Sequence, residues 1–204
     1  MSLVKRKETT KGLIIFIKNA LPGNVKTRLA KDSSEEYALK VYEALLEHTR
    51  KVSLEVELDR YLYYSDHVSE GDQWSDSDFE KYIQADGDLG EKMTSAFEAA
   101  LKKNDKVIII GSDCIQLTPD IIHLAFEALD RWDVVIGPAL DGGYYLLGMK
   151  SMDAGLFQDI QWSTSLVSDQ TLEKVITSGK TCHYLPSLSD IDYLEDWKKY
   201  GYSL

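Results

Sequence analysis

The chain has 204 residues, of which 44% are hydrophobic and 28% are charged. This length and composition fit one globular domain and exclude a disordered or fibrous protein. The formal net charge of −11 argues against a general binder of nucleic acid or of membrane surfaces.

The charge is unevenly distributed along the chain. Residues 1–31 hold eight lysines and arginines and one glutamate, whereas residues 32–204 hold 15 basic and 33 acidic side chains. A basic segment on an acidic body is what a locally bound small anion requires. We expect residues 1–11 to form a basic N-terminal tail and residues 12–204 to form a single domain.

The ends of the chain and its cysteines indicate the class of protein. The apolar run at 13–17 is too short for the core of a signal peptide and far too short to span a bilayer. Cys114 and Cys182 show neither a metal-ligand spacing nor a disulfide framework. We therefore expect a reduced, cytoplasmic protein without membrane insertion.

Hydrophobic periodicity predicts strands that alternate with helices. We expect strands at 12–17, 58–64, 80–84, 106–110, 134–137, 144–148 and 183–185, of which the first is a buried strand. Between and after them we expect a helix behind a capping box formed by Ser33 and Glu36, and helices at 89–103, from Thr118 to Leu129, at 166–178 and at 196–200. This alternation predicts a layered α/β domain with a mostly parallel sheet.

Ligands of such sheets lie beyond the carboxyl ends of the strands, so the segments that follow strands are the candidate sites. After the first strand come Lys18, Gly23, Lys26, Thr27 and Arg28. Their cationic and hydroxyl donors suit a diphosphate or triphosphate, although a solvated basic turn is an alternative. Neither a P-loop nor a Gly-x-Gly-x-x-Gly motif occurs.

Carboxylates follow two later strands. Asp113 follows the strand at 106–110 and is placed to hold a hard divalent cation, or else to cap a turn. Asp141, with Gly142 and Gly143, follows the strand at 134–137 and has an ordinary hairpin turn as its alternative.

Further candidates lie near the carboxyl terminus. Asp192 is either a second metal ligand or a helix cap, and Asp190 competes with it for the metal role. Trp162, Ser163 and Thr164 are candidates to border a ligand. No Ser/His/Asp or Cys/His set can be assembled, and Cys114 beside Asp113 is expected to have a raised pKa.

Six motifs occur in an order that resembles a known family. They are Phe16-x-Lys18 with Pro22-Gly23-x-Val25-Lys26-Thr27-Arg28-Leu29, Gln84-x-x-Gly87-Asp88-Leu89-Gly90-x-x-Met93, Gly111-Ser112-Asp113-Cys114, Gly137-Pro138-Ala139-x-Asp141-Gly142-Gly143-Tyr144-Tyr145, Trp162-Ser163-Thr164 after Phe157, and Asp190-Ile191-Asp192 with Glu195-Asp196. Together they resemble the glycosyltransferase-A-like family of radical-SAM/selenodomain-associated transferases, which is related to phospholactate and molybdenum-cofactor guanylyltransferases.

The resemblance implies a three-layer α/β/α nucleotide-diphospho-sugar transferase fold and a role for each motif. It implies that Asp113 and Asp192 hold Mg²⁺ or Mn²⁺, that the segment from Lys18 to Arg28 binds the nucleotide phosphates, and that Gly87, Asp88 and Gly90 approach the base or ribose. The segment from Asp141 through Gly142 and Gly143 to Tyr144 would face the acceptor. The first loop lacks the Gly-Gly-x-Ser-x-Arg pattern of nucleotidyltransferases.

Three hypotheses of function follow. The first is a metal-dependent transferase that uses a nucleotide-activated donor, of the glycosyltransferase type, in which Asp141 is a candidate acceptor-side base. The second is a nucleotidyltransferase that releases pyrophosphate. The third is a non-catalytic nucleotide-binding module, which would keep Lys26 and Arg28 but would not need the acidic pair. In each case the expected partner is a nucleotide or nucleotide sugar, and for the two transferases the acceptor is an unidentified small molecule.

Overall fold

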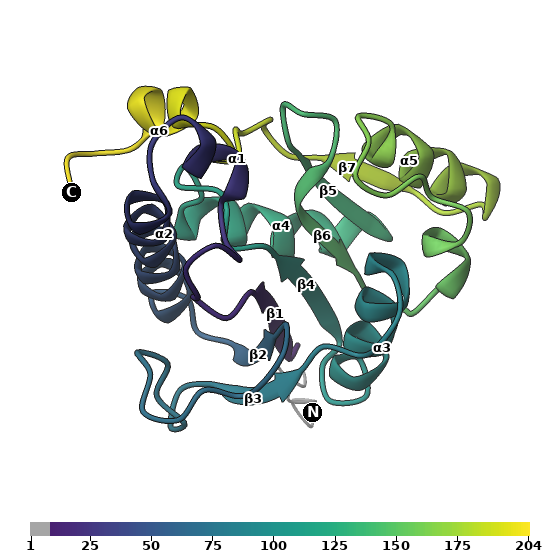
Figure 1. Ribbon diagram of the computed structural model, residues 1–204. Coiled ribbons are helices and arrows are strands. Elements are labelled where there is room, and N and C mark those ends of the chain that lie inside the picture. Colours follow the sequence, from purple (N-terminus) through teal and green to yellow (C-terminus); the bar gives the residue numbers. More distant parts are fainter. Residues whose placement is uncertain (1–8) are drawn as a thin grey trace.

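A seven-stranded sheet forms the centre of the molecule in the computed structural model, which describes residues 9–204 (Figure 1). The strands lie side by side in the order β3-β2-β1-β4-β6-β5-β7. Their bounds are β1 Lys11–Ile17, β2 Asp59–Tyr64, β3 Glu80–Ile83, β4 Lys106–Ile110, β5 Val134–Pro138, β6 Tyr144–Met149 and β7 Cys182–Tyr184. All seven predicted strands are thus present, with small shifts at their ends.

The sheet is parallel except at one strand. β1 pairs in parallel with β2 and β4, β2 with β3, and β5 with β7, whereas β6 runs antiparallel to both β4 and β5. β5 and β6 are joined by the short 139–143 loop, which is long enough for a hairpin but too short for a parallel crossover. The prediction of a mostly parallel sheet is confirmed.

Helices cover both faces of the sheet, which gives the three-layer α/β/α arrangement (Figure 1). One face packs against α2 and α4 and the other against α3, α5 and the 3-10 helix η1. Two further helices, α1 and α6, pack against the outer side of α2. Their bounds are α1 Thr27–Lys31, α2 Glu35–Leu54, α3 Leu89–Ala100, α4 Pro119–Arg131, η1 Ala154–Phe157, α5 Val167–Thr177 and α6 Leu194–Tyr200.

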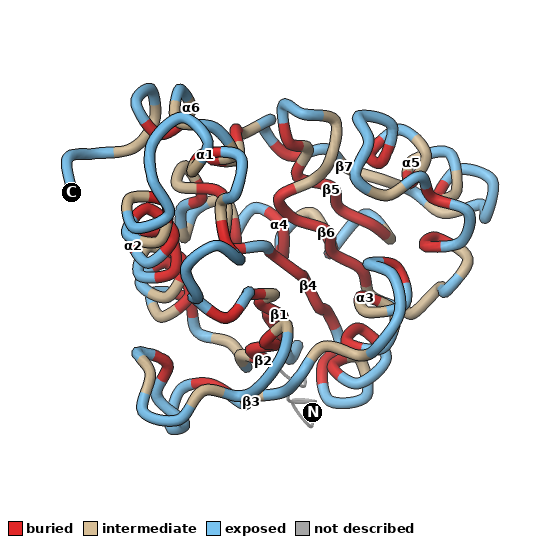
Figure 2. The backbone as a smooth tube through the Cα atoms, viewed as in Figure 1, coloured by how far each residue is buried: buried red, intermediate tan, exposed pale blue. Residues whose placement is uncertain are grey.

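The core lies in the strands that helices cover on both sides. All five residues of β4 are buried, and the buried backbone positions concentrate in the central strands (Figure 2). These strands therefore read as continuous apolar runs in the sequence, as expected for strands with two covered faces. Within the described part of the chain, no helix is both long and apolar enough to cross a membrane.

Capping residues determine where the helices begin. Thr118 accepts a hydrogen bond from the backbone N–H of Ile121 and is followed by Pro119, as predicted for α4. The prediction for α2 was wrong by one residue: Ser34 is its cap and accepts from Tyr37. The hydroxyl of Ser33 instead donates to the carbonyl of Leu29, at the end of the preceding short helix.

The N-terminal boundary also differs from the prediction. Lys11, which the sequence assigned to a tail, is the first residue of β1, and its ammonium lies 5.5 Å from the centre of the Phe126 ring. The predicted tail residues 1–8 lie outside the described part of the chain. All strands except β6 run in one direction, so the segments that follow them meet at one edge of the sheet.

Candidate functional site

The first loop, residues 18–26, leaves β1 at this edge and is shaped by a tight turn. The backbone N–H of Asn24 donates to the carbonyl of Leu21, with Pro22 and Gly23 between them. Gly23 has a φ of 77°, which glycine adopts without steric cost. The turn brings the chain back to Lys26, directly before α1.

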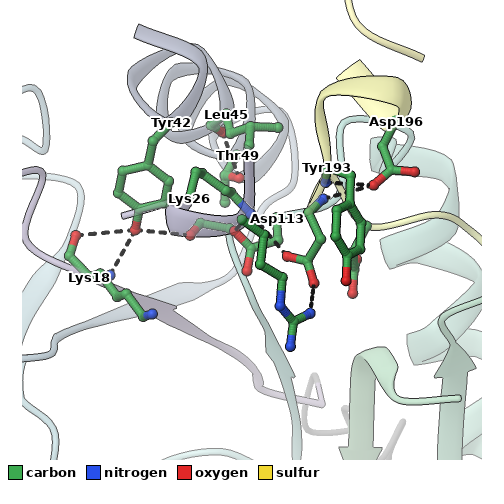
Figure 3. Close-up of polar contacts among 12 residues, drawn as sticks. Lys18, Lys26, Tyr42, Leu45, Thr49, Asp113, Tyr193 and Asp196 are labelled. Carbon is green, nitrogen blue, oxygen red and sulfur yellow. Dashed lines mark hydrogen bonds and ion pairs between the residues drawn. The ribbon is translucent and has the colours of Figure 1, made fainter. Parts of the chain in front are cut away.

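Tyr42 of α2 anchors the start of this loop. Its hydroxyl accepts a hydrogen bond from the N–H of Lys18 at 2.8 Å and donates to the carbonyl of Lys18 at 3.1 Å (Figure 3). The same hydroxyl lies 3.3 Å from the hydroxyl of Ser112, in the loop after β4. Burial raises the pKa of Tyr42, so the side chain stays a neutral donor and acceptor. The side chain of Lys18 itself is exposed.

Asn19 fixes the first loop from the other side. Its side chain is almost fully buried, and the side-chain amide nitrogen donates to the backbone carbonyl of His67 at 2.9 Å. The side-chain oxygen Oδ1 accepts a hydrogen bond from the N–H of Asp66 at 3.1 Å. Its own backbone N–H donates to the hydroxyl of Ser65. The first loop is therefore tied to the segment after β2 by a buried amide.

Four charged side chains of the candidate site come together at this edge of the sheet. The ammonium of Lys26 lies 2.5 Å from Oδ1 of Asp113 and 3.8 Å from Oδ1 of Asp192 (Figure 3). The Nη1 atom of Arg28 lies 2.9 Å from Oδ2 of Asp192, and its guanidinium lies over the ring of Tyr193. These four residues follow three different strands, and the carbonyl of Asp113 accepts a hydrogen bond from Ile191, which joins two of the segments.

Asp192 does not cap a helix, which was its alternative role. The N-cap of α6 is Tyr193, and the carboxylate of Asp196 accepts from the N–H groups of both Asp192 and Tyr193. The side chain of Asp192 is thereby free to point toward the first loop. Thr27 is the first residue of α1 and is exposed beside the cluster.

The donor set at Asp113 and Asp192 fits a divalent cation that is shared with phosphate. An ammonium already bridges the two carboxylates, so the space between them suits a positive charge. Among residues 9–204, no group of three or more histidine, cysteine, aspartate and glutamate side chains is arranged to hold a metal. Mg²⁺ is commonly bound by only one or two carboxylates together with substrate phosphates and water, and this pair matches that pattern.

Asp190 is a third carboxyl group in the cluster. Burial, and after it the negative charges of Asp113 and Asp141, raise its pKa to about 7, although the positive charge of Lys26 opposes the shift. The sequence left Asp190 and Asp192 as competitors for one role. In the structure it is Asp192 that forms the ion pairs, whereas Asp190 is a largely desolvated acid beside them.

The raised pKa expected for Cys114 is present, but its main cause is different. The pKa of the Cys114 thiol is raised to about 12, mainly by burial and then by the charge of Asp190, and the charge of Asp113 contributes least. The prediction named the adjacent Asp113, because the sequence could not show that the side chain points into the core. Both cysteines are free thiols.

The 139–143 loop forms the next part of this edge. Oδ1 of Asp141 accepts a hydrogen bond from the N–H of Gly143 at 2.9 Å, which is the turn that its alternative interpretation proposed. Gly142 has a φ of 92° and its carbonyl accepts from Ser168. Tyr144 turns away into the core, where its hydroxyl donates to the sulfur of Met93.

The remaining predicted residues lie together in a second group. Asp88 caps α3 through a capping box with Glu91, and Gly90 packs so tightly against Trp162 that a Cβ there would lie 2.8 Å from the indole ring. Gly87 has a φ of 103°. An open groove of about 570 Å³ runs between the start of α3 and η1, with Asp88 and Gly90 among its lining residues.

Ser163 and Thr164 belong to this second group because they directly follow Trp162 in the chain. Ser163 has a φ of 62°, and the hydroxyl of Thr164 donates to the carbonyl of Gln161. Ser165 directly contacts Gly142, so this segment reaches the 139–143 loop. The predicted residues thus form two groups in the structure. One is the charged cluster, and the other, called the wall around Trp162 below, consists of Trp162 with Gly87, Asp88, Gly90, Ser163 and Thr164.

Several residues of the site were not predicted. Asn19, Tyr42 and Ser112 act through buried hydrogen bonds between segments that are distant in the sequence. Tyr42 lies on the buried face of α2 and is indistinguishable by pattern from a core residue. Asn19, two residues after the predicted strand at 12–17, is the one residue of this set that could have been noticed, because an Asn at the end of a buried strand must pair its amide if it is buried.

The fold has solved relatives. A proposed nucleotide-diphospho-sugar transferase from Desulfovibrio desulfuricans G20 is similar, with a TM-score of 0.82, 28% identity, and coverage of 90% of this chain and 82% of that one. CMP:2-keto-3-deoxy-manno-octonic acid synthetase in complex with CTP has a TM-score of 0.60 at 10% identity, with 94% and 96% covered. Rv0371c of Mycobacterium tuberculosis H37Rv in complex with manganese has a TM-score of 0.53 at 14% identity, with 97% and 100% covered.

These structures establish the fold of nucleotide-diphospho-sugar transferases for this chain. A comparison with curated proteins found no match. A family model matches residues 48–164, which include β4, Asp113, the 139–143 loop and Trp162. The chain therefore belongs to the family described as "Uncharacterized protein conserved in bacteria (DUF2064)".

Proposed function

We propose that the protein is a Mg²⁺- or Mn²⁺-dependent transferase that uses a nucleotide-activated donor, of the nucleotide-diphospho-sugar type. One observation carries the proposal: Lys26 and Arg28 meet Asp113 and Asp192 at the carboxyl edge of the sheet. Cations for a diphosphate and carboxylates for a divalent cation thus lie within one cluster. Similarity to a proposed nucleotide-diphospho-sugar transferase supports the same chemistry.

The cationic residues would act on the charge of the leaving group. When a glycosyl or nucleotidyl group is transferred, negative charge builds up on phosphate oxygens, and fixed cations stabilise it. Arg28 offers a planar guanidinium that can bind two phosphate oxygens, and Lys26 offers a point charge. A divalent cation bound by Asp113 and Asp192 would supply Lewis-acid neutralisation of the same oxygens.

The acceptor would enter on the side of the 139–143 loop. Asp141 is exposed, and one of its carboxylate oxygens is engaged by Gly143, which leaves the other available to accept a proton from an acceptor hydroxyl. Asp190 lies close enough to Asp141 to feel its charge. The wall around Trp162 and Gly90 would border the donor, at the base, ribose or sugar.

Nucleotidyl transfer from a triphosphate is the second candidate, and the neighbour that contains CTP favours it. The two reactions give different products from the donor: glycosyl transfer releases a nucleotide, whereas nucleotidyl transfer releases pyrophosphate. Release of pyrophosphate from GTP or CTP, without turnover of nucleotide sugars, would replace the first candidate by the second.

A thermal-shift screen of nucleotides and nucleotide sugars, with and without Mg²⁺, tests the proposal without knowledge of the acceptor. A ligand at a hundred times its dissociation constant stabilises the folded state by about 2.7 kcal/mol. For a chain of this size that corresponds to an increase in Tm of about 5–10 °C. We expect such an increase only when nucleotide and Mg²⁺ are both present.

Two variants make the screen specific. Asp113→Asn should abolish the effect of Mg²⁺, and Asp120→Asn, which neutralises an exposed acid at the start of α4, should retain it. If no nucleotide raises the Tm of the wild-type chain under either condition, the proposal fails.

A further inference from the structure

The ammonium of Lys26 lies where a metal ion between Asp113 and Asp192 would lie. It is 2.5 Å from one carboxylate and 3.8 Å from the other. The side chain of Lys26 is only 5% exposed, whereas the side chains of Asp113 and Asp192 are 46% and 36% exposed. The lysine therefore lies beneath the carboxylates, and their outer surfaces remain open to solvent and to an arriving cation.

The backbone at Lys26 is in an uncommon conformation. Its φ of 48° and ψ of 41° are left-handed, which costs a residue other than glycine roughly 1–2 kcal/mol. Lys26 occupies the N-cap position of α1, yet its side chain caps nothing there. In this conformation the side chain of Lys26 reaches both aspartates, at 2.5 Å and 3.8 Å.

The charges around Lys26 explain why an ammonium is held there. The carboxylates of Asp113 and Asp192 both lie within 4 Å of the ammonium of Lys26, so their negative charges converge on it. Two carboxylates that converge on one point repel each other unless a cation lies between them. A divalent cation would fulfil that role with twice the charge, and two cations cannot share the space between the same oxygens.

We propose that Lys26 is an exchangeable counter-cation of the Asp113–Asp192 pair, which a divalent metal displaces. This inference rests on the proposed function, since it requires that the pair hold a metal. When the metal displaces it, the ammonium is released beside the first loop, where it can form an ion pair with a bound polyphosphate. Arg28 is coupled in the same way, because it shares Asp192. Metal and polyphosphate would then bind cooperatively, because the binding of each would increase the affinity for the other.

If Lys26 and the metal exchange, removal of the lysine should strengthen metal binding. Lys26→Met removes the competitor and keeps most of the aliphatic side chain, so metal binding in the absence of nucleotide should become tighter by about tenfold, within the usual range of coupling between two sites. A residue that helped to bind the metal would show the opposite effect. Lys31→Met is the matched control, because Lys31 is an exposed lysine of the same short helix.

Calorimetric titration of the full chain with MnCl₂, without nucleotide, measures this effect. Tighter binding to Lys26→Met together with unchanged binding to Lys31→Met supports the exchange. Equal or weaker binding to Lys26→Met overturns the exchange and leaves the proposed metal site intact. If Mn²⁺ binds to none of the three proteins, with or without nucleotide, the proposed metal site fails, and the exchange fails with it.

A second measurement uses only the wild-type protein and does not depend on whether a variant folds. Lysines are acetylated briefly with acetic anhydride, and the modified sites are located by mass spectrometry, with Lys31 as the internal reference. Without metal, Lys26 should be protected because its ammonium is buried and paired. Addition of Mn²⁺ should increase acetylation of Lys26 several-fold relative to Lys31. Unchanged protection in saturating Mn²⁺ would overturn the exchange.

Discussion

Arg28 and Asp192 are joined by a hydrogen-bonded ion pair of 2.9 Å, although 164 positions separate them in the sequence. The pair connects the first helix of the chain to the segment that precedes the last helix. It therefore links two segments of the chain at the edge of the sheet where the candidate site lies. The side chain of Arg28 is 55% exposed, so the pair contributes little to stability and remains available to a ligand.

Arg28→Ala should weaken nucleotide binding in the presence of Mg²⁺ by about 1.5–3 kcal/mol, which is the value of hydrogen bonds to a charged group. This corresponds to roughly a tenfold to hundredfold higher dissociation constant. Calorimetric titration of nucleotide into both proteins measures the change. The Tm without ligand should hardly change, and a dissociation constant equal to that of the wild type would remove Arg28 from the phosphate site.

Gly142→Ala should displace the 139–143 loop. A Cβ at Gly142 would lie 2.1 Å from the backbone oxygen of Ser165, and the φ of 92° is strained for alanine. We expect a loss of at least about 2 kcal/mol in the free energy of unfolding. Chemical denaturation measures it, and Gly111→Ala, where a Cβ would meet nothing within 4 Å, is the control. Equal stability of both variants would contradict the packing described here.

Asn19→Ala should destabilise the fold through the first loop. The substitution leaves the N–H of Asp66 and the carbonyl of His67 without their buried partner. Each such loss costs about 1–3 kcal/mol, so we expect the Tm to fall by about 5–10 °C. Asn24→Ala, in the exposed turn of the same loop, should change the Tm by less than about 2 °C. A similar Tm for both variants would show that the buried amide does not anchor the loop.

Neither cysteine should react with thiol reagents in the folded protein at neutral pH. Burial raises the pKa of Cys114 to about 12 and that of Cys182 to about 11, and only the thiolate reacts. The reactive fraction should rise about tenfold for each pH unit below these values. Absorbance after addition of a disulfide reagent should show slow reaction near pH 8 and rapid reaction of both thiols in denaturant. Rapid reaction of the native protein would contradict the burial.

Most of the fold could be predicted because its strands are continuous apolar runs between turn residues, as at Lys106–Ile110. Period and composition are the same for a parallel and an antiparallel strand, so the antiparallel direction of β6 could be predicted only from the short 139–143 segment, as the hairpin alternative for Asp141 proposed. α1 was missed because it has five residues, of which only Leu29 is buried, too few to show a helical period. η1 was missed for the same reason.

The candidate site was predictable in position but not in its internal pairing. The rule that ligands lie beyond strand ends selected Lys26, Arg28 and Asp113, whereas Asp192 was a candidate because it precedes the last helix and because of the resemblance. The structure places the four side chains together. The sequence assigned the cations to phosphate and the carboxylates to metal as separate groups. In the structure Lys26 instead pairs with Asp113, and its backbone is left-handed; no pattern of residue types reveals either feature.

The metal dependence of nucleotide binding tests the central claim most directly. Nucleotide sugars and triphosphates are titrated calorimetrically into the wild-type chain and into Asp113→Asn, with Mg²⁺ and with a chelator. The proposed function predicts that Mg²⁺ tightens binding to the wild-type chain by at least about tenfold, a coupling of about 1.4 kcal/mol, and has no effect on Asp113→Asn. Nucleotide affinity that neither Mg²⁺ nor Asp113→Asn changes would contradict it and would indicate a non-catalytic nucleotide-binding module.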